Sequence, residues 1–348
     1  MTVLAAIAVA LGATWLSLGL WLLGERSSYD RARRRTDPDA DALSSSRVDP
    51  RAFSRHRLRR VALGPLRGAA SVAATELVRR DAAGLYVVAT GRRRSARLRA
   101  LTVLARGGDP AAGRLVRTLI ESRDAVDATG LLRLAGELPT AESDPLLLEL
   151  LVAGRLPRSR TATELEPRTS RLRDQLVPLT SADDPELRFW AVTLLTRQMS
   201  HFPVADAVRA RAGDDSPSVR AAVADALGYV PAGSAHGLLR ALLADDVFYV
   251  RSHAARAVAQ SRDEALAEEL LPLLADRNWW VRAAAKESLG ALGDTGLDVA
   301  VAALSHSDPF ARDSALEILA GAGRLVDLGG RAVTELATSP PLPAVEIA

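Results

Sequence analysis

The sequence predicts an all-α protein, a solenoid of stacked helix pairs that follows one membrane-spanning helix. Three observations carry this prediction. A short pattern ending in arginine recurs along the chain, a long uncharged apolar run lies at the N-terminus, and the composition is 48% hydrophobic but only 4% aromatic. Ala, Leu and Val therefore supply most of the buried surface, which suits closely packed helices better than a β-sheet core.

The recurring pattern is clearest at residues 276–290. Five small or aliphatic residues there fall at helical spacing and form one face: Val281, Ala284, Ala285, Ser288 and Leu289. The arginines at equivalent positions are separated by 32, 31, 31 and 30 residues, and they are Arg188, Arg220, Arg251, Arg282 and Arg312. A fixed period of this length predicts a solenoid, and both halves of each period are expected to be helical.

The N-terminal run from Val3 to Leu23 is 21 residues long and contains no charged residue. At about 1.5 Å per residue it matches the ~30 Å hydrocarbon layer of a bilayer. A cleaved signal peptide is the alternative. Against it, Met1 and Thr2 supply no basic residue, and the run exceeds the roughly 7–15 residues of a signal peptide's apolar region. Residues 1–24 are therefore predicted to be a transmembrane signal-anchor helix.

Arginines follow the predicted span closely: Arg26, Arg31, Arg33, Arg34 and Arg35. The positive-inside tendency predicts a single-pass protein of the cell membrane, with its N-terminus outside and its solenoid in the cytoplasm. A solvated stop sequence alone accounts for these arginines, and a contact with an anionic membrane surface is a further hypothesis. Residues 25–52 lack hydrophobic periodicity and are expected to be a basic flexible tether.

Charge is distributed unevenly along the chain. Residues 25–120 carry a net charge of +13 and residues 121–348 a net charge of −10. The basic part leaves open a nucleic-acid-binding module, but aromatic residues are sparse there and the predicted span confines it to the membrane. The net negative charge of residues 121–348 disfavours a DNA-binding groove in this part, so nucleic acid is not the expected partner.

The helical pattern begins at Phe53. Residues 53–168 are expected to form degenerate repeats, with an irregular loop at 156–168 where the periodicity fails. Regular repeats are expected over 169–338, including a first helix at 264–275 and a capping helix at 324–337. Residues 339–348 form a tail.

The pattern Asp…Val-Arg-x-x-Ala-Ala-x-x-Leu-Gly resembles HEAT and HEAT-like repeats of the phycobilisome-lyase type, strongly from 183 to 321 and weakly before. The resemblance implies a right-handed α-solenoid in which the helix bearing Val-Arg is the second of each pair and lines the concave side. It also implies a ladder of turn aspartates and arginines between neighbouring repeats. The matching residues are Asp184 and Arg188, Asp215 and Arg220, Asp246 and Arg251, Asp276 and Arg282, and Asp308 and Arg312.

A narrower likeness lies in Trp279-Trp280-Val-Arg, echoed by Phe248-Tyr249-Val-Arg, in a chain with one predicted span. In these features the chain resembles bacterial membrane-anchored HEAT-repeat proteins that accompany a membrane-bound glycosyltransferase. The resemblance implies such an enzyme as a partner.

No motif for catalysis or ligand binding stands out. Cysteine is absent, and no two of the five histidines are three or four residues apart. Acid pairs recur at the repeat period, which is typical of architecture, whereas a catalytic dyad occurs once. We therefore expect no enzyme, cofactor or metal site. A HEAT-like lyase-type enzyme or a DNA-repair glycosylase is the alternative, and it would need an acid–base site in the groove.

Aromatic residues near the starts of the second helices are the expected protein-binding residues: Trp190, Phe248, Tyr249, Trp279, Trp280 and Phe310. Large aromatic side chains along one edge favour a protein partner. The alternative is that all of them belong to the core. The favoured function is a membrane-tethered scaffold or adaptor.

Overall fold

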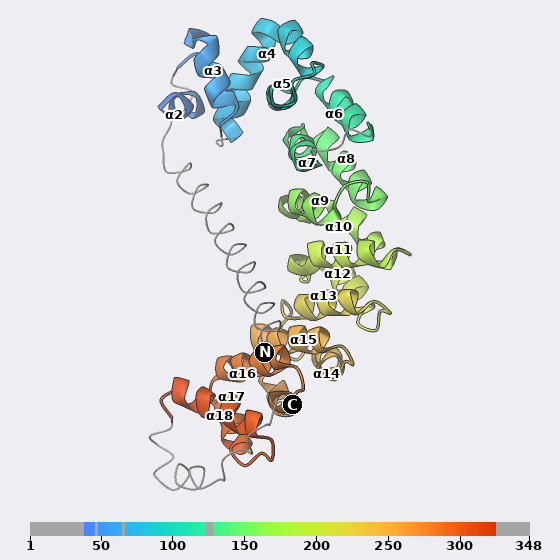
Figure 1. Ribbon diagram of the computed structural model, residues 1–348, viewed down its shortest axis with the longest axis vertical. Coiled ribbons are helices and arrows are strands. Elements are labelled where there is room, and N and C mark those ends of the chain that lie inside the picture. Colours follow the sequence, from blue (N-terminus) through green and yellow to red (C-terminus); the bar gives the residue numbers. More distant parts are fainter. Residues whose placement is uncertain (1–37, 46–47, 65–66, 123–127, 325–348) are drawn as a thin grey trace, which may run out of the picture. The chain divides into compact units, whose positions relative to one another are not determined.

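The computed structural model describes residues 38–45, 48–64, 67–122 and 128–324, and these ranges are helical with no strand (Figure 1). The chain divides into two compact units, residues 1–164 and 165–348. The expected membrane span, the capping helix beyond residue 324 and the tail lie outside the described residues. Within the described ranges, no helix combines the length and apolar character needed to cross a bilayer.

Unit 1 is a succession of packed helices. The elements are α2 (Pro38–Ser44), η1 (Pro50–Ala52), α3 (Arg55–Ala62), α4 (Arg67–Ala89), α5 (Arg94–Arg106), α6 (Ala112–Glu121), α7 (Ala128–Glu137), α8 (Thr140–Ala153) and α9 (Arg158–Leu165). Helix α4 bends at Asp81, whose φ of −157° and ψ of 55° are not helical. Helices α3 and α5 pack on α4, and α7 packs on α5 and α8.

Residues 25–52 were expected to form a flexible tether, but α2 lies within this segment. Its residues Asp39, Ala40 and Leu43 are buried, and the helix packs on α4. Hydrogen bonds from Arg57 and Arg60 of α3 hold the Asp39 carboxylate and offset the cost of burying it. The sequence conceals this helix because one inward position is an aspartate and the helix is only 7 residues long.

The segment expected to be an irregular loop at 156–168 is also helical. It forms α9 followed by the 3₁₀ turn η2 (Glu166–Arg168). Its buried side chains lie at helical spacing: Arg158, Thr161, Ala162 and Leu165. Because Arg and Thr occupy two of these inward positions, the apolar periodicity that identifies a helix in a sequence is lost.

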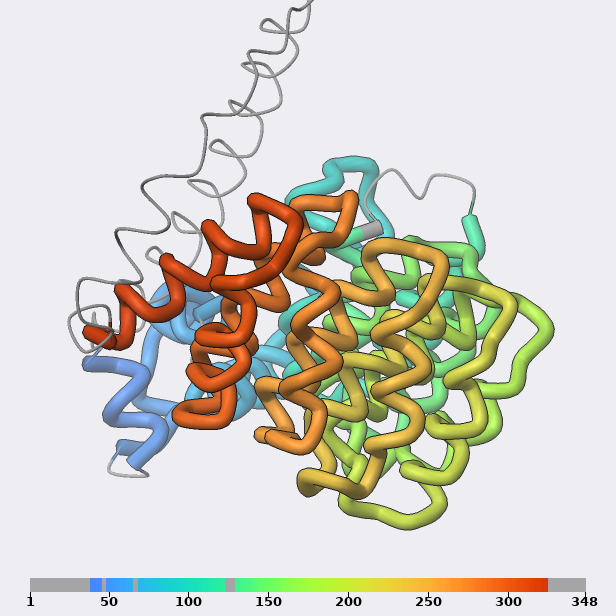
Figure 2. The backbone as a smooth tube through the Cα atoms, turned by 90° about the horizontal axis from the view of Figure 1, so that it is seen from below, coloured from blue at the N-terminus to red at the C-terminus, as the bar shows by residue number. Residues whose placement is uncertain are grey.

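Unit 2 repeats one motif, a first helix followed by a second helix bearing the recurrent arginine (Figures 1 and 2). The first segments are α10 (Thr169–Leu176) with η3 (Val177–Ser181), α12 (Phe202–Arg209), α14 (His236–Leu243), η5 to η7 (Glu264–Leu266, Glu268–Leu270, Pro272–Ala275) and α17 (Gly293–Ala303). The second helices are α11 (Pro185–Leu195), α13 (Pro217–Leu227), α15 (Phe248–Ser261), α16 (Trp279–Ala291) and α18 (Pro309–Gly321). A further 3₁₀ turn, η4 (Thr196–Gln198), follows α11.

Each second helix of unit 2 packs against the next, so that α11, α13, α15, α16 and α18 form one row. The inward face of α16 consists of the five residues identified in the sequence, all of them buried. The segment 264–275 differs from the expected first helix, since it consists of three 3₁₀ turns. Pro272 lacks the N–H that an α-helix would need at that position.

Candidate protein-docking edge

An arginine ladder joins the first turns of successive second helices in unit 2. In each rung, the Nε and Nη2 atoms of an arginine donate to the two carboxylate oxygens of an aspartate that precedes the next second helix. The rungs are Arg188–Asp214 at 2.8 and 2.8 Å, Arg220–Asp245 at 2.6 and 2.9 Å, and Arg251–Asp276 at 2.8 and 3.0 Å. Two parallel charge-assisted bonds are the strongest arrangement available to this pair of side chains.

Each rung also closes the turns on both sides of it. The third arginine nitrogen, Nη1, donates to two backbone carbonyls of its own turn, as Arg220 does to Asp214 and Asp215 at 2.8 and 3.4 Å. Each ladder aspartate accepts the backbone N–H two residues later, as Asp245 does from Val247 at 2.9 Å. The ladder therefore fixes the first turns of neighbouring second helices relative to one another.

The ladder carboxylates are largely withdrawn from water, with 3–9% of their side-chain surface exposed. Burial alone would raise the pKa of Asp214, Asp245 and Asp276. The hydrogen bonds from the paired arginine and from the following N–H outweigh burial, so the pKa of each aspartate lies below its usual value. The aspartates are thus charged at neutral pH.

The structure corrects two of the aspartates assigned to the ladder from the sequence. Asp215 and Asp246 are exposed, and the preceding residues Asp214 and Asp245 form the rungs. Position explains the difference, because the residue six before the arginine turns inward, as Asp276 does before Arg282, whereas the residue five before it faces water. The constant interval of six residues was present in the sequence and would have identified the correct residues.

Two further aspartates assigned to the ladder act as helix caps. Asp184 and Asp308 stand four residues before their arginines, and their side chains accept the N–H of Glu186 at 2.9 Å and of Phe310 at 2.8 Å. These caps satisfy N–H groups that have no partner within the helix.

Aromatic side chains project from the first turns of α15, α16 and α18, and we call this surface the aromatic edge. The exposed fractions are 40% for Phe248, 53% for Trp279, 49% for Trp280 and 54% for Phe310. The Trp279 and Trp280 rings stack with centroids 3.9 Å apart. The alternative that all of these residues are core does not hold.

Two other aromatic residues expected to bind protein are less accessible. Trp190 and Tyr249 are half-buried and pack edge-on against Phe189 and Phe248, with ring centroids 4.9 and 5.5 Å apart. Trp190 also lies further along its helix than the others, in the second turn of α11. The arginines expected near the membrane, Arg26, Arg31 and Arg33 to Arg35, lie outside the described residues.

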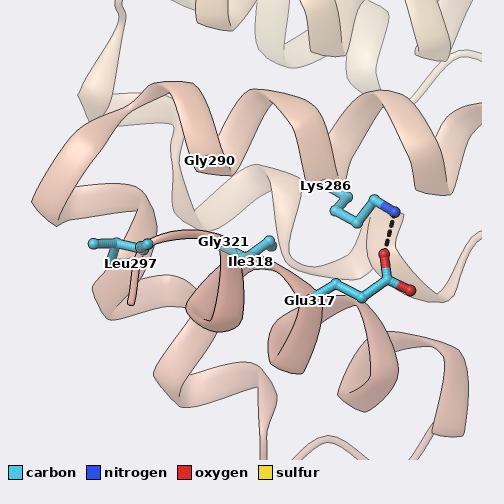
Figure 3. Close-up of a pocket in the computed structure, with 7 residues that line it drawn as sticks. Lys286, Gly290, Leu297, Glu317, Ile318 and Gly321 are labelled. Atoms are coloured by element: carbon cyan, nitrogen blue, oxygen red, sulfur yellow. Dashed lines mark hydrogen bonds and ion pairs between the residues drawn. The ribbon is translucent and has the colours of Figure 1, made fainter. Parts of the chain in front are cut away.

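A pocket of about 290 Å³ lies among α16, α17 and α18 (Figure 3). Lys286 and Glu317 face each other as an ion pair on one side of it, and Leu297 lies on the other. The two charges pair with each other, and Leu297, Ile318 and Ala322 supply apolar parts of the wall. Within the described parts of the chain, no three His, Cys, Asp or Glu side chains are grouped so as to hold a metal ion.

Comparison with known proteins places repeats of a known family in unit 2. Residues 235–320 match HEAT repeats, while no curated protein matches the sequence. Among solved structures, an engineered protein is 20% identical (87% of this chain, 95% of that chain, TM-score 0.39). YibA of Escherichia coli is 15% identical, the match covers 72% of this chain and 95% of that chain, and the TM-score is 0.43. Human deoxyhypusine hydroxylase in complex with glycerol is 20% identical, the match covers 74% of this chain and 98% of that chain, and the TM-score is 0.29.

The matched region contains α14 to α18, and hence the aromatic edge and the last rung of the ladder. The sequence match and the succession of helix pairs in unit 2 agree on the architecture, an all-helical α-solenoid. Residues 235–320 of this chain are thus similar to HEAT repeats, and the helix pairs of unit 2 continue the same arrangement.

Proposed function

We propose that this protein is a non-enzymatic scaffold that docks another protein on the aromatic edge. HEAT repeats are typical of interaction surfaces built from rigid stacked helices. The observation that carries the proposal is the exposure of Trp279, Trp280 and Phe310 on first turns held in place by the helix row. Aromatic residues that are rigidly presented and half-exposed are the residue type that dominates binding energy at protein interfaces.

The test is loss of a partner on W279A/W280A substitution. Full-length protein is purified in mild detergent from its own membranes, and co-purifying proteins are quantified by mass spectrometry. We expect a stoichiometric partner to be reduced at least about tenfold by the double substitution, because removal of two anchoring aromatics exceeds 1.4 kcal/mol. The melting temperature should change little, since both side chains are half-exposed.

F202A provides the matched control. Phe202 begins α12, a first helix, and is 76% exposed. Its removal also deletes an exposed aromatic ring but lies outside the aromatic edge, so partner recovery should be unchanged. Equal loss in F202A and W279A/W280A, or no loss in either, would contradict docking at this edge.

We further propose that residues 1–24 anchor the protein in the cell membrane, with its N-terminus outside and the solenoid in the cytoplasm. The uncharged run Val3 to Leu23 and the arginines that follow it support this proposal. A membrane-bound glycosyltransferase is the class of partner that the tryptophan doublet, together with the single predicted span, suggests. We expect to identify such an enzyme in the purified complex. Recovery of a soluble partner alone would exclude a glycosyltransferase as the partner.

The basic stretch behind the proposed anchor is expected to hold the chain against anionic lipid. Each arginine near such a surface contributes about 1 kcal/mol. Substitution of Arg31, Arg33, Arg34 and Arg35 by Gln, in protein lacking residues 1–24, should reduce co-sedimentation with phosphatidylserine vesicles by at least about tenfold at low salt. The same substitutions should have no effect on vesicles of phosphatidylcholine alone. Unchanged binding to the anionic vesicles would dismiss the lipid contact and leave the arginines as a stop sequence.

A further inference from the structure

The arginine ladder of unit 2 stops at Arg282. The residue six before the next arginine, Arg312, is His306 and not an aspartate. His306 closes its turn in the way that the ladder aspartates close theirs, since its Nδ1 accepts the N–H of Asp308 at 3.0 Å. It supplies no carboxylate, so the local turn is preserved while the acidic half of the rung is missing.

Arg282 nevertheless keeps the position of its three equivalents. Its Nη1 donates to the carbonyls of Asp276 and Arg277 at 2.8 and 3.4 Å, as the Nη1 atoms of the paired arginines do in their own turns. In Arg188, Arg220 and Arg251 this contact leaves Nε and Nη2 to bind a carboxylate. For Arg282, the described part of the chain offers these two nitrogens no hydrogen-bond partner, and the side chain is half-buried and open to solvent.

Two aspartates stand in the turns that precede α16 and α18, and both have other hydrogen-bond partners. Asp276 is bound by Arg251, and the Oδ1 of Asp308 accepts the N–H groups at the start of α18. Neither is paired with Arg282 in the described part of the chain.

Exposed aromatic rings lie beside this guanidinium. Its carbon atom lies 4.3 Å from the centroid of the Phe310 ring, and Trp279 stands three residues earlier on the same side of α16. A stacked guanidinium retains its in-plane N–H donors, so it can bind a carboxylate edge-on while the rings contact apolar groups.

We propose that Arg282 binds a carboxylate of the docked partner, an aspartate or glutamate beside an apolar residue, which takes the place of the missing rung. This inference rests on the proposed docking at the aromatic edge and names the chemistry that is recognised there. The ladder itself shows which ligand this arrangement takes, because the same atoms of three equivalent arginines bind a carboxylate at 2.6–3.0 Å. The apolar neighbour of the acid would contact Trp279 and Phe310.

The test uses a displayed library of random short peptides selected on the full-length protein in mild detergent. Peptides that lose binding to W279A/W280A are kept, and their affinities are measured by fluorescence anisotropy. We expect these peptides to share an acidic residue next to an aromatic or aliphatic one. Changing that residue to its amide, or R282Q in the protein, should weaken binding at least about tenfold. R256Q removes an exposed arginine of α15 that lies away from the aromatic edge, and it should leave the affinity unchanged.

A second variant separates recognition from misfolding. H306D supplies the missing carboxylate at the ladder position, so Arg282 becomes paired within the chain. Peptide affinity should fall by about as much as in R282Q, while the melting temperature rises. S307D adds the same charge one residue later, at the position equivalent to the exposed Asp246, and should change the affinity less than about twofold.

The outcomes distinguish the two proposals. Peptides that require Trp279 and Trp280 but tolerate R282Q, H306D and the amide substitution would overturn the carboxylate site and leave docking at the edge intact. A selection that yields no peptide dependent on the two tryptophans would overturn both. Loss of affinity in H306D with a raised melting temperature would establish the site.

Discussion

D245A is expected to lower the free energy of unfolding by about 3 kcal/mol, because it removes one partner of a largely buried ion pair. Asp245 holds both carboxylate-facing nitrogens of Arg220 at 2.6 and 2.9 Å and also accepts the Val247 N–H. Its loss leaves the guanidinium, whose side chain is only 17% exposed, without a counter-charge. For a unit of this size the melting temperature should fall by roughly 6–12 °C.

The neighbouring D246A substitution is the control. Asp246 is exposed, and only its backbone carbonyl contacts Arg251, so replacing its side chain should change the stability by less than about 0.5 kcal/mol. Urea unfolding of both variants, followed by circular dichroism, measures the difference. Equal effects of the two substitutions would show that the rung is not formed by the first aspartate of the pair.

Acid should destabilise unit 2 through the same three carboxylates. The pKa values of Asp214, Asp245 and Asp276 are lower in the folded protein than the usual value of 3.8. Groups with a depressed folded pKa stabilise the protein above the unfolded pKa, and this stabilisation is lost as the pH falls toward the folded pKa. The melting temperature should therefore be nearly constant from about pH 7 to 5 and should fall steeply below about pH 4.

Unit 1 adds to this acid sensitivity through Glu76. Hydrogen bonds from Arg79, above all, and from Arg80 outweigh burial and lower the pKa of Glu76 from 4.5 to about 2. Its contribution is therefore lost between about pH 4.5 and 2. Thermal scans between pH 7 and pH 3 test both units, and D245A should lose less additional stability in acid than the unsubstituted protein. A melting temperature that holds constant down to pH 3 would contradict the pKa assignments.

The sequence predicts the second helices of unit 2 well because their inward faces are almost purely apolar at helical spacing. Val281, Ala284, Ala285 and Leu289 all appear buried as the pattern requires. Helices whose inward positions are polar lack this apolar periodicity, so the sequence does not predict them. Asp39 in α2 and Arg158 in α9 are buried, and their cost is offset by hydrogen bonds that only the folded chain brings together.

The sequence predicts where the aromatic residues of the candidate site lie, but it does not predict which of them are exposed. Helical spacing puts the aromatic residues on the first turns of the second helices, yet their exposure depends on what neighbouring repeats cover. Pro217 and Ser218 occupy the corresponding place in α13, so the aromatic edge is confined to the last three second helices. The missing rung at Arg282 follows from the same six-residue interval, since His306 precedes Arg312 by six residues and takes the place of an aspartate. What the interval does not show is that Arg282 keeps the position of the paired arginines, which depends on its contacts in the folded chain.

Site-specific photocrosslinking in cells tests the docking surface most directly. A photoreactive benzoylphenylalanine replaces Trp280 or Phe310 on the aromatic edge, or Phe202 on α12 as the control. Docking on the aromatic edge predicts one crosslinked product, containing the same partner, from positions 280 and 310 and none from position 202. No product from 280 and 310, or an equal product from all three positions, would contradict it.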